Sequence, residues 1–125
     1  MQPITYENTT SGIFDAVKIV FVLPHKASID YRGLIADTGS MRPTFDSGDM
    51  LIVQYNPSDL QRGDIIYFRA PAGIVTTNLV FHRIMDIKSD KDGIFYQTKG
   101  DNNIYADDFK VRPDMIIGRV VGILV

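Results

Sequence analysis

The sequence predicts a mainly β domain with many turns and little helix, on three observations. Valine, isoleucine, tyrosine and phenylalanine, which favour strands, are frequent and gather in short apolar runs. Every acidic residue except Glu7 is an aspartate, which favours turns and caps over helix interiors. Glycine- or aspartate-containing turns separate the runs at regular spacing, as in a curled sheet or barrel. At 125 residues, the chain has the length of one domain with a sizeable core.

The N-terminal part has the weakest patterning. Residues 1–12 are polar toward their end and are expected to form an extended arm or loop. Residues 13–23 are expected to form a helix turn that runs into a strand, and residues 25–33 a polar connection. A short strand over 34–36 then leads into a turn around Ser40.

The rest of the chain alternates apolar runs with strong turn signals. Asp46-Ser47-Gly48-Asp49 and Arg62-Gly63-Asp64 are turn sequences, and the proline and glycine of 70–73 break a strand. A charged hairpin tip is expected over 89–93 and a long loop over 99–110. The expected strands cover residues 50–55, 65–69, 78–86, 94–98 and 115–124.

Composition excludes several classes of protein. The net charge of −2 and the absence of a basic block argue against nucleic-acid binding. The absence of cysteine excludes disulfides and cysteine metal sites, and the aspartates show no EF-hand spacing, so no metal or other cofactor is expected. The apolar run over 19–23 is too short to span a bilayer and ends at Pro24.

Ser40 is the candidate nucleophile. It lies between Gly39 and Met41, just before Pro43, which disfavours regular helix or central strand. Glycine beside the serine lets a substrate backbone approach closely. A single turn serine is usually structural, but Ser40 belongs to a longer pattern that continues through Phe45.

His82 is the candidate general base. Strand alternation would place it on one face with Val80 and Ile84, toward the interior or a cleft. A histidine in an apolar run is more often a core residue than a base. The other histidine, His25, lies in a polar connection beside Lys26 and is the weaker candidate.

The third member of a serine hydrolase site would be an aspartate from the late loop. Asp101 lies in a generic turn sequence, and Asp107 and Asp108 are also explained as a solvated pair. As a group they offer the carboxylate that a serine–histidine pair needs to orient the imidazole.

Together these residues resemble type I signal peptidases, peptidase family S26, over residues 36–125, with residues 1–35 as an N-terminal arm and connection. His82 stands where the common bacterial branch has lysine, so the chain is similar to the archaeal and endoplasmic-reticulum branch. The matching blocks, in chain order, are Thr38–Phe45, Ser47–Val53, Arg62–Arg69 with Phe81–Ile84, and Thr98–Asn103 with Asp107, Asp108 and Ile117–Gly122.

The resemblance implies a signal-peptidase-like (LexA-like) catalytic domain of coiled antiparallel sheets and a serine endopeptidase that removes signal peptides from secreted preproteins. Ser40 would attack the scissile carbonyl and His82 would take its proton. Asp108 or Asp107 would orient the ring, with Asp108 favoured, and Asp101 would support the loop. The Ser40 N–H would be an oxyanion donor, with a second donor unassigned.

The resemblance also implies a substrate preference and a location. The family cleaves after small residues, and Ile35, Ala36 and Met41 are the candidate pocket walls. Members usually carry a membrane helix before the serine block, and residues 1–35 do not supply one. The expected partners are preprotein signal peptides, the membrane surface on the non-cytoplasmic side and membrane proteins of a complex.

Three alternatives compete with this interpretation. A self-cleaving repressor-type (LexA-like) peptidase shares the serine–methionine pair, but it uses a lysine base and usually bears a DNA-binding helical domain, and neither is visible here. A non-catalytic module that binds signal peptides is a second alternative. A β domain with a coincidental motif is a third, which four ordered blocks disfavour.

Overall fold

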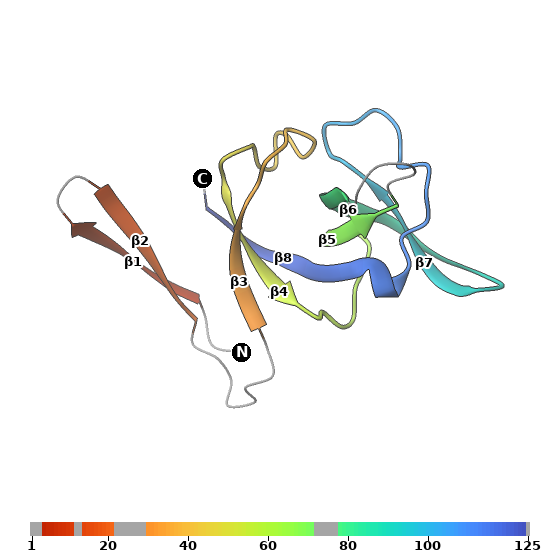
Figure 1. Ribbon diagram of the computed structural model, residues 1–125, viewed down its shortest axis with the longest axis horizontal. Coiled ribbons are helices and arrows are strands. Elements are labelled where there is room, and N and C mark those ends of the chain that lie inside the picture. Colours follow the sequence, from red (N-terminus) through yellow and green to blue (C-terminus); the bar gives the residue numbers. More distant parts are fainter. Residues whose placement is uncertain (1–3, 12–13, 22–29, 72–77, 125) are drawn as a thin grey trace.

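The computed structural model describes residues 4–11, 14–21, 30–71 and 78–124, and nearly all of its regular structure is strand (Figure 1). Within these ranges, no helix has the length and apolar character needed to cross a membrane. A single short 3-10 helix, η1 (Pro113–Met115), is present there. The strands are β1 (Ile4–Ser11), β2 (Phe14–Phe21), β3 (Asp30–Ile35), β4 (Met50–Tyr55), β5 (Ile65–Ala70), β6 (Asn78–Asp90), β7 (Gly93–Lys99) and β8 (Ile116–Leu124).

A six-stranded antiparallel sheet positions the candidate site. Its order is β3-β4-β8-β5-β6-β7, so the C-terminal strand β8 pairs with β4 on one side and β5 on the other (Figure 1). The register shifts at three places, between Ile52 and Val53, between Tyr67 and Phe68, and between Ile84 and Asp86. Such irregularities bend strands and increase twist. The predicted mainly β fold of coiled antiparallel strands is confirmed.

The N-terminal expectations are wrong in part. β1 and β2 pair along their whole length, so residues 4–11 are a strand, and no helix turn is present in residues 14–21. Strand pairing satisfies the backbone groups of one segment through another, so the residues of either strand alone do not reveal that the two will pair. β3 pairs throughout with β4. The position between 35 and 36, where the N-terminal arm and connection were predicted to give way to the catalytic domain, falls at the end of β3.

The later strands agree well with the sequence. The strand predicted over 50–55 is confirmed at the same bounds, and β5, β7 and β8 match their predictions to within one residue at each end. β6 is longer than predicted and runs on to Asp90. The predicted polar connection over 25–33 is wrong for residues 30–33, which belong to β3, and its residues 25–29 lie outside the described residues.

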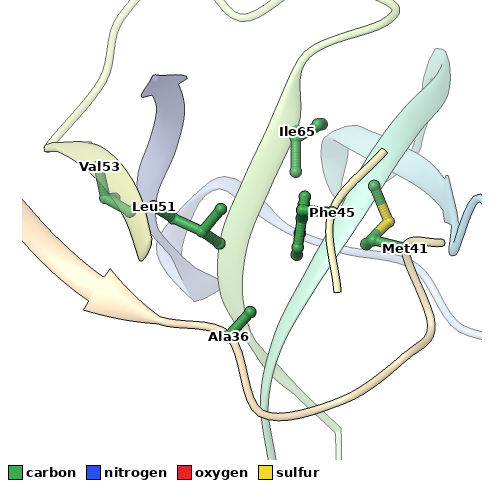
Figure 2. Packing of buried hydrophobic residues seen from close by; sticks show 6 residues of the cluster. All are labelled: Ala36, Met41, Phe45, Leu51, Val53 and Ile65. Carbon is green, nitrogen blue, oxygen red and sulfur yellow. The ribbon is translucent and has the colours of Figure 1, made fainter. Parts of the chain in front are cut away.

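Two apolar clusters cover the two faces of the sheet. On β5, Ile65 packs in the first cluster, whereas Ile66 and Phe68 pack in the second, as strand alternation requires. Figure 2 shows the first cluster, in which residues of the β3–β4 connection meet β4 and β5. Its buried members are Ala36, Met41, Phe45, Leu51, Val53 and Ile65.

Gly118 is required by the close approach of β8 and β4. A Cβ atom at this position would overlap the Val53 side chain and lie 2.9 Å from the Gln54 carbonyl oxygen. We expect Gly118→Ala to lower the free energy of unfolding by about 1–3 kcal/mol, because overpacking forces backbone shifts. Urea unfolding at neutral pH measures the change. Gly122→Ala, whose Cβ would meet only the Ile52 side chain at 3.2 Å, is the milder control; equal losses would contradict the explanation.

Candidate active site

Ser40 lies on the connection between β3 and β4, which is held at its base and at its centre. The Ala36 N–H donates to the Asp49 carbonyl at 2.9 Å, and the Gly48 N–H donates to the Ala36 carbonyl at 2.8 Å. Next to the serine, Met41 is 1% exposed and packs in the first cluster. The turn that carries Ser40 is therefore anchored to the core by its own neighbour.

The Ser40 hydroxyl has a second hydroxyl beside it. Ser40 Oγ is 3.2 Å from Thr38 Oγ1, and the Ser40 N–H donates to the same Thr38 oxygen at 3.5 Å. Ser40 is half-buried, whereas Thr38 is exposed. Sequence reasoning placed Thr38 in the serine block without assigning it a task.

His82 is held by a carboxylate and by an aromatic ring. Its Nδ1 is 2.7 Å from Asp107 Oδ2, with both side chains close to 90% buried. Thr98 Oγ1 donates to the same carboxylate oxygen at 2.6 Å, and the Phe68 and His82 rings pack in an edge-to-face arrangement with their centroids 6.3 Å apart. Because Nδ1 faces a carboxylate, it carries the proton in this arrangement, and Nε2 is left as the acceptor. This is the orientation that a general base needs.

The structure places Asp107, not the favoured Asp108, against the histidine. The Asp107 N–H donates to the Thr98 carbonyl at 2.8 Å, which turns the Asp107 side chain toward β6. Asp108 is exposed, and no side-chain hydrogen bond or ion pair reaches it within the described ranges. The sequence alone left both residues open, since they are adjacent and chemically identical.

The loop over 100–103 brings the serine turn and the histidine together. The Asn102 N–H donates to the Ser40 carbonyl at 2.8 Å, and the Asn102 side chain donates to the Gly39 carbonyl at 3.2 Å. A Cβ atom added to buried Gly100 would lie 2.7 Å from the Ser40 carbonyl oxygen and 3.0 Å from His82 Nε2. His82 Nε2 and the Ser40 carbonyl oxygen therefore both lie beside Gly100.

Ser40 and His82 also line one cavity of about 210 Å³. Aromatic and aliphatic side chains form most of its wall, so water is partly excluded from the hydroxyl and the imidazole. The described residues around it are Ala36, Asp37, Thr38, Ser40, Phe45, Leu79, Val80, Phe81 and His82. Leu79 and Phe81 were not predicted here, although they share a strand with His82.

The three predicted pocket residues have different places. Ala36 is 2% exposed and lines the cavity that holds Ser40. Ile35 is 57% exposed and lines a neighbouring cavity of about 150 Å³. Met41 lines neither cavity; its side chain is buried in the first cluster, and its sulfur accepts the Asp101 N–H at 3.4 Å.

Asp101 joins three segments around the site without touching the imidazole. Arg83 donates to both of its carboxylate oxygens, at 3.0 and 2.8 Å, and Thr44 donates to Oδ2 as well. Arg83 also donates to the Gly63 carbonyl at 2.7 Å. The Arg83 guanidinium lowers the pKa of Asp101 below its ordinary value, against an opposing effect of burial, and the Thr44 hydroxyl lowers it further.

We expect the ion pair between Asp101 and Arg83 to stabilise the fold above pH 4. Because the folded-state pKa is depressed, the contribution is present above the unfolded value near 3.8 and is lost as the pH falls through the folded value. Asp101→Asn should lower the free energy of unfolding by about 1–3 kcal/mol at pH 7 and flatten its slope below pH 4. Denaturant unfolding across that range tests this. Exposed Asp108→Asn is the control and should run parallel to the wild type; a steep acid slope retained in Asp101→Asn would contradict the prediction.

The site contains the chemical groups that an acyl-transfer reaction requires. It combines a hydroxyl, an imidazole with an orienting carboxylate, and backbone and hydroxyl donors near the hydroxyl. Within the described ranges, no group of three or more histidine and acidic side chains converges as metal ligands would.

Comparison with known proteins agrees with this arrangement. The family model described as signal peptidase, peptidase S26, matches residues 13–123. Signal peptidase I W of Bacillus subtilis (strain 168) is 36% identical over 87 residues, which cover 68% of this chain and 44% of that protein. The signal peptidase complex catalytic subunit sec11 of Dictyostelium discoideum is 34% identical over 95 residues, 70% of this chain and 51% of that protein. No solved structure matches.

The chain belongs to the signal peptidase family, peptidase S26. It spans about half the length of the curated relatives described above. The predicted family is thereby confirmed, and the family match includes Ser40, His82 and Asp107.

Proposed function

We propose that this chain is a serine endopeptidase domain that removes signal peptides from preproteins, with Ser40 as nucleophile, His82 as general base and Asp107 as the orienting acid. The observation that carries the proposal is the His82–Asp107 pair, whose 2.7 Å contact leaves Nε2 free beside the Ser40 turn. Family membership supplies the substrate class.

The first half of the reaction forms an acyl-enzyme. Ser40 Oγ attacks the carbonyl carbon of the scissile peptide while His82 Nε2 takes the hydroxyl proton. The carboxylate of Asp107 stabilises the imidazolium that results. His82 then gives the proton to the leaving amine, and the carbon–nitrogen bond breaks. Among the described residues the hydrogen-bond partner of the Ser40 hydroxyl is Thr38, so the mechanism needs the hydroxyl and Nε2 to come together when substrate binds, as is common for catalytic hydrogen bonds.

The second half regenerates the serine. Water attacks the ester carbon as His82 takes one of its protons, and the carbon–oxygen bond to Ser40 breaks with return of that proton to Oγ. In both halves the oxyanion needs donors. The Ser40 N–H is one of them, and the Thr38 hydroxyl, already 3.2 Å from Ser40 Oγ, is suited to be the second.

An extended substrate fits the first part of β6, whose edge away from β5 pairs with no other described strand. β5 pairs with residues 78–83 on one side, and the described pairing with β7 begins only at Arg83 on the other. The Ile84 N–H donates toward the β5 side, to the Asp64 carbonyl, so by alternation the backbone groups of Leu79 and Phe81 face the open side. A peptide strand added there would pass Ser40, and cavities of about 150 and 210 Å³ would take small side chains.

The setting of the reaction follows from its substrates. Signal peptides are apolar and enter membranes, so the domain is proposed to work at a membrane surface on the non-cytoplasmic side. The relatives from Dictyostelium discoideum and Clavispora lusitaniae are described as catalytic subunits of a signal peptidase complex. A similar association with membrane-protein partners is proposed for this chain.

A lysine-based mechanism has less support. Among the described residues no lysine lines the cavity that holds Ser40, and the nearby Lys99 amine donates to the Gly100 carbonyl at 2.9 Å. Of the described residues that line that cavity, His82 is the one with a basic side chain.

The proposal is tested by incubating the chain with a purified preprotein in detergent. The expected product begins directly after a small residue that has another small residue two positions earlier, as N-terminal sequencing of the product would show. A preprotein with a bulky residue at the cleavage position is the matched control and should remain intact. Failure of the folded chain to cut the first preprotein would contradict the proposal.

A further inference from the structure

Asp37 lies where the two cavities beside Ser40 meet. It lines the cavity of about 210 Å³ that contains Ser40 and His82, and it also lines the neighbouring cavity of about 150 Å³. Leu79 and Phe81 are the other residues common to both. A charge on Asp37 therefore borders both spaces that a peptide on the open edge of β6 would fill.

Asp37 is the one charged residue among the described residues that line the smaller cavity. Its remaining described lining consists of Leu34, Ile35, Tyr67, Leu79 and Phe81. Within the described ranges, no ion pair or side-chain hydrogen bond reaches the Asp37 carboxylate, which lies on an exposed residue. Burial is the main cause that raises the pKa of the Tyr67 phenol on the cavity wall; Tyr55 and the Asp37 carboxylate raise it further, whereas the Arg69 guanidinium opposes them.

We propose that Asp37 is a specificity-determining residue that excludes acidic side chains from the smaller cavity and so selects peptides with a small neutral residue there. This inference rests on the proposed function. Nothing in the catalytic steps uses the Asp37 carboxylate, and among the described residues no cationic side chain forms an ion pair with it.

Strand geometry says which substrate residue is affected. In an extended peptide, alternate side chains point to one face, about 6.5–7 Å apart along the strand. If the residue before the scissile bond enters the cavity that contains Ser40, the residue two positions earlier enters the smaller cavity. An acidic side chain there would face the Asp37 carboxylate within a partly dry space, where like charges a few ångströms apart repel by about 1 kcal/mol or more.

Asparagine and aspartate have nearly the same size but differ in charge, so a pair of peptides that differ only in these residues isolates the effect of the charge. Three peptides carry alanine, asparagine or aspartate two positions before the cleaved residue and are otherwise identical. For the wild type we expect kcat/KM to be about fivefold or more higher for the asparagine peptide than for the aspartate peptide, since about 1 kcal/mol corresponds to that ratio. The ratio should shrink as salt is raised, because ions screen a partly exposed pair.

Variants of Asp37 decide the origin of the preference. Asp37→Asn should reduce the asparagine-to-aspartate ratio to less than about twofold, and Asp37→Glu, which keeps the charge, should retain most of it. Asp92→Asn, which removes an exposed carboxylate from the β6–β7 hairpin region, is the control and should leave the ratio at the wild-type value.

The two proposals fail in different ways. If the wild type cuts the alanine peptide but treats the other two alike, or if Asp37→Asn keeps the full ratio, the role of Asp37 is overturned and the proposed function stands. If the folded wild type cuts none of the three peptides, the peptidase proposal fails and the Asp37 inference fails with it.

Discussion

Ser40→Ala and His82→Ala are each expected to lower kcat for preprotein cleavage by about 10⁶-fold, the size found when a nucleophile or its base is removed from a serine peptidase. The reason is that the two groups act as one unit: without the imidazole the hydroxyl is a poor nucleophile, and without the hydroxyl the imidazole has nothing to activate. The double variant should therefore be no slower than either single variant. Initial rates of product formation, followed by gel or mass spectrometry, provide the measurement.

Controls must separate chemistry from folding. Ser58→Ala changes an exposed serine that lines a different cavity, so its rate should stay within about twofold of the wild type. Denaturant unfolding of each variant shows whether it is folded, which matters most for His82→Ala, because His82 is buried. A folded Ser40→Ala protein that cuts at the wild-type rate would remove Ser40 from the mechanism.

Asp107→Asn is expected to lower kcat/KM by about 10⁴-fold, as amidation of the orienting acid does in a serine–histidine–aspartate site. The amide can present an N–H to Nδ1, which favours the tautomer with the proton on Nε2, and an Nε2 that carries a proton cannot take one from Ser40. It also removes the negative charge that stabilises the imidazolium. Thr98 contacts the same oxygen of Asp107, so the altered group would still be held in place.

The neighbouring aspartate is the matched control for this prediction. Asp108→Asn makes the same chemical change one residue away, on an exposed side chain, and should leave kcat/KM within about twofold of the wild type. Parallel kinetics of the two variants, with unfolding curves for both, decide between them. A larger loss for Asp108→Asn than for Asp107→Asn would show that the catalytic arrangement differs from this structure.

The strands that the sequence predicted well are those whose signal is local. Met50–Tyr55 is an apolar run between turn sequences, and the structure has the strand at these bounds. β1 and β2 were not predicted as a hairpin, because their backbone hydrogen bonds depend on each other and not on either segment alone. β6 was predicted too short for a related reason, since its end pairs with β7 across the turn.

The candidate site divides in the same way. Ser40 and His82 were singled out from residue type, neighbours and family resemblance, and the structure brings both to one cavity. Met41 was expected in a pocket wall, but packing turned its side chain into the core. No role was predicted for Thr98, because the sequence of an alternating strand does not show which carboxylate a threonine in it will contact.

Periodicity, turn residues and the four ordered blocks were enough to predict a mainly β domain and its family and to single out two of the three proposed catalytic residues, because these depend on short-range pattern and residue chemistry. Such patterns could not predict the choice between Asp107 and Asp108. Nor could they predict the contact of the Gly100 loop with the Ser40 turn, or the position of Asp37 between two cavities. Each depends on which backbone groups pair across distant segments, and that pairing exists only once the sheet has formed.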